Sequence, residues 1–292
     1  MVTVDSRPVV VGADGSEAAL DAVTWAAREA AFRHVTLRIV HAFAWPMLNV
    51  PTVLWQEGQE AAMHAHAELV LAEAEKVARS VAPALDVSTE VVTEMALPLL
   101  LTASRHAAYV VVGTSGVGAL ADAVAGSPTV ELVAKSHAPV VVVRGTPSPD
   151  RAEGLVVVGV DGSPQSAAAV EVGTKEAALR GGRLMVVHVS RHGPAARLRR
   201  MLARTPADLT LTGRALTGWR REYPDLPVEE RVATGHPAGV LVDLSERASL
   251  VVVGTRGRGG FTGMLLGSTS QALLHHARCP VIVVAHRQGE AQ

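Results

Sequence analysis

The sequence predicts two tandem, doubly wound α/β domains, and three observations support this fold class. Short runs of β-branched residues alternate with Ala-rich helical patterns along the chain, which is typical of parallel strands joined by right-handed helical crossovers. An apolar strand followed by Asp-Gly-Ser occurs twice, at Asp14 and at Asp161. A glycine-rich loop also occurs twice, beginning at Gly113 and at Gly254. A chain of 292 residues has room for two such domains.

The first half is expected to contain five strands and four helices. Ser16 is suited to cap the first helix, because its hydroxyl oxygen can accept a hydrogen bond from a main-chain N–H of the first turn. Pro83 ends the second helix. The strands are expected at residues 9–11, 35–42, 87–92, 109–112 and 140–143, and the helices at 17–33, 57–81, 98–106 and 129–136.

The second half repeats this order. Ser163-Pro164 resembles an N-cap followed by proline at the first helical position, and Gly181-Gly182 marks the end of that helix. The crossover at 191–226 diverges from the first half. Strands are expected from residue 156 and at 184–189, 228–233, 250–253 and 280–284, and helices at 237–247 and up to 277. The predicted domains are 1–146 and 155–292, joined by a Pro/Gly linker at 147–154.

Both glycine loops share one spacing: Gly, two residues, Gly, nine residues, Gly-Ser. The copies are Gly113, Gly116 and Gly126-Ser127, and Gly254, Gly257 and Gly267-Ser268. Glycine lets the main chain approach a ligand closely, and the N–H groups at a helix start attract anions. In open parallel sheets, ligands lie beyond the carboxyl ends of the strands. We therefore expect one phosphate-binding cleft in each half, lined by the glycine loop and the Asp-Gly-Ser turn.

Composition excludes several other classes of protein. The formal net charge is −1, so the chain as a whole offers no electrostatic basis for binding nucleic acid or an anionic membrane. Cys279 is the single cysteine, which excludes intramolecular disulfides and cysteine-based zinc sites. Residues 1–8 contain no apolar signal core, and no apolar run approaches the roughly 18 residues of a membrane span. We expect a cytoplasmic protein.

The motifs resemble those of the universal stress protein family in its tandem form, and in particular its ATP-binding subclass. The resemblance rests on Val-Gly-Val-Asp-Gly-Ser at 158–163, Val-Val-His-Val at 186–189, Gly235-His236-Pro237 and the loop 254–268. It implies ATP in each half, a divalent ion such as Mg²⁺ on the phosphates, and a five-stranded sheet of order 3-2-1-4-5 with helices on both faces. It also implies that fifth-strand edges pair, either within one chain or in a homodimer.

The resemblance assigns roles to residues of both halves. Asp14 and Asp161 would lie beside the adenine and ribose, and Ala42 and Val189 would contact adenine through their main chain. The glycines and Gly-Ser pairs would hold the ribose and phosphates. The full set of predicted ATP-binding residues is Ala13, Asp14, Ala42, Gly113, Gly116, Gly126, Ser127, Val160, Asp161, Val189, Gly254, Arg256, Gly257, Gly267, Ser268 and Thr269.

The first half departs from the pattern. Ser115 stands where the second half has Arg256, and Asp122 stands where it has Gly263. A carboxylate within a phosphate loop repels the ligand unless a cation neutralises it. The second site is therefore expected to be the stronger one.

Three functional hypotheses remain open. The leading one is an ATP-binding, nucleotide-dependent regulator of the stress response. No Gly-Lys-Ser/Thr P-loop occurs in the chain, so the lysine that would contact β- and γ-phosphates is missing. That favours retention of ATP over rapid turnover. The alternatives are a slow ATPase or phosphotransferase, and a chaperone-like interaction protein for which ATP is a stabilising ligand.

Other polar and apolar groups have simpler interpretations. His64 and His66 lie on different helix faces and make a poor metal pair. His41 and His188, at strand ends, are expected to pack or hydrogen-bond rather than catalyse. The arginines at 191–204 are interpreted first as a solvated helix face, and alternatively as a docking surface for an acidic partner or phosphate. The apolar loop at 43–56 is expected either to pack on its own sheet or to cover the interface between the halves, and the interface is favoured because exposing an apolar loop is costly.

Overall fold

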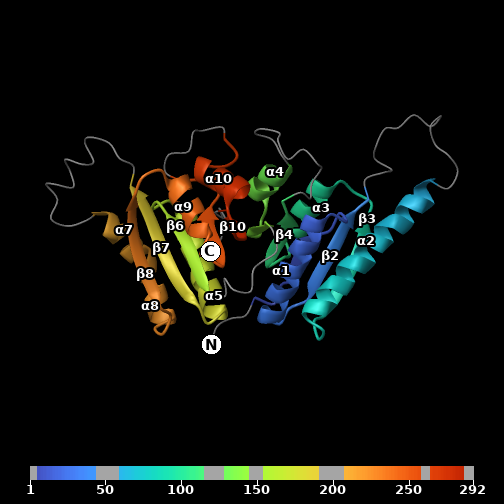
Figure 1. Ribbon diagram of the computed structural model, residues 1–292, viewed down its shortest axis with the longest axis horizontal. Coiled ribbons are helices and arrows are strands. Elements are labelled where there is room, and N and C mark those ends of the chain that lie inside the picture. The colour runs from blue at the N-terminus through green and yellow to red at the C-terminus, as the bar shows by residue number, and fades with distance from the viewer. Residues whose placement is uncertain are drawn as a thin grey trace, which may run out of the picture. The chain divides into compact units, whose positions relative to one another are not determined.

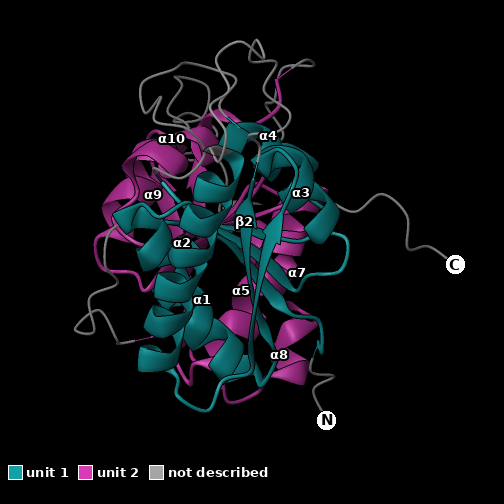
Figure 2. Cartoon of the chain, turned by 90° about the vertical axis from the view of Figure 1, so that its right-hand side faces the viewer, with its two compact units in different colours: residues 1–145 teal, residues 146–292 magenta. Residues whose placement is uncertain are grey.

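The computed structural model describes residues 5–43, 59–114, 128–144, 154–190, 207–257 and 264–285. The chain divides into two compact units, Met1–Gly145 and Thr146–Gln292, which Figure 2 colours teal and magenta. Helices and strands alternate through both units (Figure 1). The predicted fold class is therefore confirmed in each unit.

Unit 1 holds a five-stranded parallel sheet in the order β3-β2-β1-β4-β5. Helix α1 packs against α2, and α3 packs against α4, which gives the sheet two helical layers. The strands are β1 (Val9–Gly12), β2 (Leu37–Ala42), β3 (Val87–Val92), β4 (Tyr109–Gly113) and β5 (Val140–Val143). The helices are α1 (Glu17–Arg33), α2 (Gln59–Val81), α3 (Ala96–Ala103) and α4 (Pro128–Lys135).

Unit 2 repeats this topology in the order β8-β7-β6-β9-β10, again with parallel strands. Because β6 and β9 are neighbours, their carboxyl ends open at the same edge of the sheet. The strands are β6 (Leu155–Val160), β7 (Arg183–Ser190), β8 (Val228–Thr234), β9 (Leu250–Gly254) and β10 (Val281–Val284). The helices are α5 (Pro164–Leu179), α7 (Ala207–Leu216), α8 (Trp219–Glu222), α9 (Pro237–Ser245) and α10 (Ser268–His276).

The core follows from the composition of the central strands. Strands β4, β5 and β10 are buried along their whole length, as expected for near-continuous Val and Ile runs covered on both faces. Small alanines of α1, such as Ala26 and Ala30, are completely buried against the sheet. These packed layers hold the strand ends, and hence the site, in fixed positions.

Most predicted elements agree with the structure to within about two residues. Helix α3 begins at Ala96, before Pro98, because a missing N–H is tolerated in the first turn of a helix. The divergent crossover contains α7 and α8, for which the sequence analysis predicted no helix. Gly181, which follows the C-cap residue Arg180 of α5, takes the left-handed conformation with a φ of 58°. Apart from Gly154, the predicted linker lies outside the described residues.

Candidate functional site

The site of unit 2 begins with the turn after β6. Asp161 Oδ1 accepts the main-chain N–H of Ser163 at 3.0 Å, and Gly162 between them has a φ of 79°. A positive φ is readily adopted by glycine, which explains the Asp-Gly-Ser sequence. The Ser163 hydroxyl then caps α5 by accepting the N–H of Ser166 at 3.2 Å. The Asp161 side chain is thus tied to the beginning of a helix.

Unit 1 contains the same turn after β1. Asp14 Oδ1 accepts the N–H of Ser16 at 3.0 Å, Gly15 has a φ of 82°, and Ser16 Oγ accepts the N–H of Ala19 at 3.1 Å. Asp14 is exposed, whereas Asp161 is half-buried. The repeated local sequence therefore gives a repeated local structure, but only the second carboxylate is partly enclosed.

The second strand of each unit contributes a histidine beside this turn. His188 Nδ1 lies 2.9 Å from the carbonyl oxygen of Val160, and His41 Nδ1 lies 2.7 Å from that of Ala13. Both rings hydrogen-bond to main chain, which is one of the two roles expected from the sequence.

The glycine loop of unit 2 is closed by main-chain contacts. The N–H of Gly267 donates to the carbonyl of Thr255 at 2.8 Å, and Ser270 Oγ donates to the same carbonyl at 3.0 Å. Arg256 Nε donates to the carbonyl of Leu265 at 3.4 Å. These bonds hold the first turn of α10 next to the end of β9.

Close contacts explain three of the loop glycines, at two positions of the shared spacing. A Cβ on Gly254 would lie 2.6 Å from Gln165 Cβ, and one on Gly113 would overlap the Ala18 carbonyl. The first glycine of each loop is therefore explained by close packing on the preceding helix. A Cβ on Gly257 would instead overlap the Asp161 carboxylate, so this glycine makes room for a side chain of the opposite wall.

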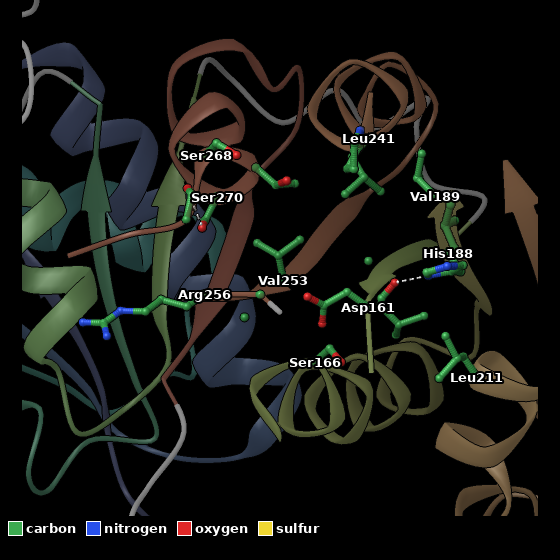
Figure 3. A pocket seen from close by; sticks show the side chains of 18 residues that line it. Asp161, Ser166, His188, Val189, Leu211, Leu241, Val253, Arg256, Ser268 and Ser270 are labelled. Atoms are coloured by element: carbon green, nitrogen blue, oxygen red, sulfur yellow. Dashed lines mark hydrogen bonds between the residues drawn. The ribbon is translucent and has the colours of Figure 1, made fainter. Parts of the chain in front are cut away.

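These elements surround one cavity of about 560 Å³. Part of its wall is apolar, with valines of β7 together with Leu211 from α7 and Leu241 from α9. The remaining wall is polar and carries Asp161 and the first residues of α10. Figure 3 shows Leu241, Val189 and Leu211 on one side, Ser268 and Ser270 on another, and Asp161 between them.

All nine residues predicted for the second site line this cavity. They are Val160, Asp161, Val189, Gly254, Arg256, Gly257, Gly267, Ser268 and Thr269. Figure 3 shows the Arg256 side chain extending away from Asp161, so its guanidinium group is not directed at the centre of the cavity.

Sequence reasoning missed nine further lining residues. They are Gly159, Ser166, Val187, His188, Leu211, Pro237, Leu241, Val253 and Ser270. Several of these adjoin predicted positions, and His188 stood out as a strand-end polar group. Nothing in the local sequence marks Leu211 or Leu241, because their place in the wall depends on how α7 and α9 pack on the sheet.

In unit 1, the described part of the predicted site is Ala13, Asp14, Ala42 and Gly113, all at or directly after the ends of β1, β2 and β4. The remaining members, Gly116, Gly126 and Ser127, lie outside the described residues, as do Ser115 and Asp122. The arginines at 191–204 and the apolar loop beyond Phe43 also fall outside them.

Within the described residues, no three His, Cys, Asp or Glu side chains gather in a way that could hold a metal ion. Nor does any helix in that part of the chain combine the length and apolarity needed to cross a membrane.

The fold and the site together define a class of protein: a tandem α/β protein with a cavity at the carboxyl ends of its parallel strands. The chain belongs to the universal stress protein family, whose model matches residues 6–144 and again 155–285.

Full-length relatives support this assignment. The universal stress protein Rv2005c of Mycobacterium tuberculosis is 40% identical, with 94% of this chain and 96% of the relative covered. Rv1996 of the same organism is 39% identical, with 97% and 96% covered. The crystal structure of a universal stress protein from Archaeoglobus fulgidus matches with a TM-score of 0.72 at 20% identity, covering 97% of this chain and 99% of that one. This last similarity shows the fold.

Proposed function

We propose that the chain binds ATP in the cavity of unit 2 and acts as a nucleotide-dependent regulator. One observation carries the proposal: residues of the Asp turn, the end of β7 and the glycine loop, far apart in sequence, line a single cavity. The cavity volume of about 560 Å³ falls within the range of roughly 300–1,000 Å³ that is usual for small-molecule sites.

The walls of the cavity match the two ends of a nucleotide. Val187, Val189, Leu211 and Leu241 offer an apolar surface for a flat base. At the polar end, α10 begins at Ser268, and the free N–H groups of a first helical turn favour phosphate. The Asp161 carboxylate lies between these two ends (Figure 3), where it can accept hydrogen bonds from ribose hydroxyls.

A divalent ion would have to depend on the phosphates. Among the described residues that line the cavity, Asp161 carries the one carboxylate. Mg²⁺ in nucleotide sites is typically held by one or two carboxylates plus phosphate oxygens and water. The residues present therefore fit an ion that binds together with the nucleotide. Asp161 is the side chain whose chemistry suits it to hold that ion.

Retention of ATP is favoured over rapid turnover. The described lining includes no lysine, and its one arginine, Arg256, bonds to a loop carbonyl. Rapid phosphoryl transfer relies on cations placed on the β- and γ-phosphates. We extend the proposal to unit 1, where Ala13, Asp14, Ala42 and Gly113 would contribute to a second site.

The test begins with protein purified without added nucleotide. Heat release and chromatography should yield an adenine nucleotide, and calorimetry on stripped protein should give tighter binding for ATP than for GTP. Asp161→Ala should weaken that binding. Absence of bound nucleotide together with no measurable ATP affinity would overturn the proposal, whereas timed phosphate release above an Asp161→Ala control would favour the slow ATPase instead.

The regulatory part needs a separate measurement. Partner capture should differ between ATP-loaded and stripped protein. If ATP raises the melting temperature but leaves partner binding unchanged, ATP is only a stabilising ligand. Pairing through the fifth-strand edges stays a prediction, which light scattering with and without ATP can test for the homodimer.

A further inference from the structure

The histidine at the end of the second strand makes the same bond in both units. His188 Nδ1 lies 2.9 Å from the Val160 carbonyl oxygen, and His41 Nδ1 lies 2.7 Å from the Ala13 carbonyl oxygen. In each unit this carbonyl belongs to the residue directly before the aspartate of the Asp-Gly-Ser turn. The contact is thus duplicated together with the turn, and it involves the peptide group that leads into each aspartate.

The acceptor determines which ring nitrogen carries the proton. A carbonyl oxygen only accepts hydrogen bonds, so Nδ1 of His188 has to be the donor. Neutral His188 therefore adopts the tautomer protonated at Nδ1. Protonation of the ring would add an N–H at Nε2 and leave the Nδ1 bond in place.

The bond controls the direction of the following residue. A peptide group is planar, so fixing the Val160 carbonyl also fixes where the N–H and Cα of Asp161 lie. The Asp161 carboxylate is then held by the Ser163 N–H at 3.0 Å, and the missing side chain of Gly257 leaves room for its second oxygen. Figure 3 shows His188 bonded beside this turn, with the Asp161 carboxylate directed away from the imidazole.

We infer that His188 is a positioning residue of the nucleotide site, which acts by holding the Asp161 turn so that the carboxylate is directed into the cavity. The inference rests on the proposed function for its ligand. His188 also lines the cavity, so the experiment has to separate positioning from direct contact with the ligand.

Two substitutions at this position make that separation. His188→Asn keeps an N–H donor at the place of Nδ1 but removes the rest of the ring, whereas His188→Leu keeps apolar bulk and removes the donor. Loss of one neutral hydrogen bond predicts that His188→Leu weakens ATP binding about 3- to 10-fold. His188→Asn should stay within about twofold of the wild type. Equal losses for both variants would mean that the ring itself contacts the ligand, which overturns the inference.

A matched control removes a similar bond away from the cavity. Thr174 in α5 is buried, and its hydroxyl donates to the Val170 carbonyl at 2.8 Å. Thr174→Val should lower the unfolding free energy but leave ATP affinity unchanged. If Thr174→Val weakens ATP binding as much as His188→Leu does, the effect is one of general stability and positioning is refuted.

A double-mutant cycle tests whether His188 acts through Asp161. In an Asp161→Asn background, His188→Leu should change the ATP affinity by less than about twofold, because the group that it positions is already altered. If His188→Leu retains its full effect in that background, it acts independently of Asp161 and the inference fails.

A measurement without nucleotide keeps this inference separate from the proposed function. Nitrogen-15 NMR of the imidazole ring in the wild-type protein should show the Nδ1-protonated tautomer for His188, and the Ser163 amide should exchange faster in His188→Leu. The opposite tautomer would overturn the inference even if ATP binds. If the wild type does not bind ATP but shows this tautomer and this difference in exchange, the proposed function fails while the positioning of the turn stands.

Discussion

The contact between Gly257 and Asp161 leads to a specific prediction for Gly257→Ala. A Cβ at position 257 would overlap the second carboxylate oxygen of Asp161. The carboxylate has to move, and its 3.0 Å bond to the Ser163 N–H is then weakened or lost. We expect this single methyl group, which lies on the opposite wall of the cavity, to alter the proposed nucleotide site.

The size of the effect follows from the kind of bond. A hydrogen bond to a charged group contributes about 1.5–3 kcal/mol. If the nucleotide depends on the same carboxylate orientation, ATP binding should weaken by roughly 10- to 100-fold. The free energy of unfolding should fall by no more than about 3 kcal/mol, because no other bond is broken.

Calorimetry on stripped protein measures the affinity, and urea unfolding measures the stability. Gly239→Ala is the matched control, because a Cβ at this position of α9 meets nothing within 4 Å. In a helix that change stabilises by up to about 1 kcal/mol, and it should leave ATP affinity as it is. Wild-type affinity in Gly257→Ala would refute the argument that this glycine is needed to seat the Asp161 carboxylate.

Three further predictions concern stability. Gly173→Ala in α5 should destabilise by about 1–3 kcal/mol in urea despite better helix propensity, because its Cβ would overlap a valine of β6. Arg180→Ala should cost about 3–5 kcal/mol in the same assay, because it leaves Glu176 fully buried without this ion pair. The hydrogen bond from Arg7 lowers the pKa of Asp5, so the wild type should exceed Asp5→Asn in stability at pH 7 by less than about 1 kcal/mol. This difference should begin to fall below about pH 4, the ordinary pKa of an aspartate, and should be lost as the pH falls through the lowered pKa of folded Asp5.

The architecture could be predicted from the sequence alone because the two halves of the chain repeat the same pattern. Each strand–turn–helix signal appeared twice, and consistent local preferences are what make an element predictable. The Asp-Gly-Ser turns illustrate this: Gly162 and Gly15 both take the positive φ that their position requires. Helix α1 and strand β3 match the predicted bounds, because the residue patterns that predict them lie within the segments themselves.

The sequence also identified half of the cavity wall of unit 2. The residues found this way, such as Asp161 and Gly267, lie at strand ends or helix starts. At such positions the place of a residue in the chain already determines that it faces the carboxyl edge of the sheet. Their roles toward ATP remain predictions.

Contacts between distant segments were decided only by the tertiary structure. Leu211 and Leu241 reach the cavity through the way in which α7 and α9 pack on the sheet, and no local pattern encodes that packing. The placement of Gly257 against Asp161 likewise depends on the neighbouring positions of β6 and β9. Strand register and helix packing bring such residues together, and both arise from burial summed over the whole unit rather than from the residues concerned.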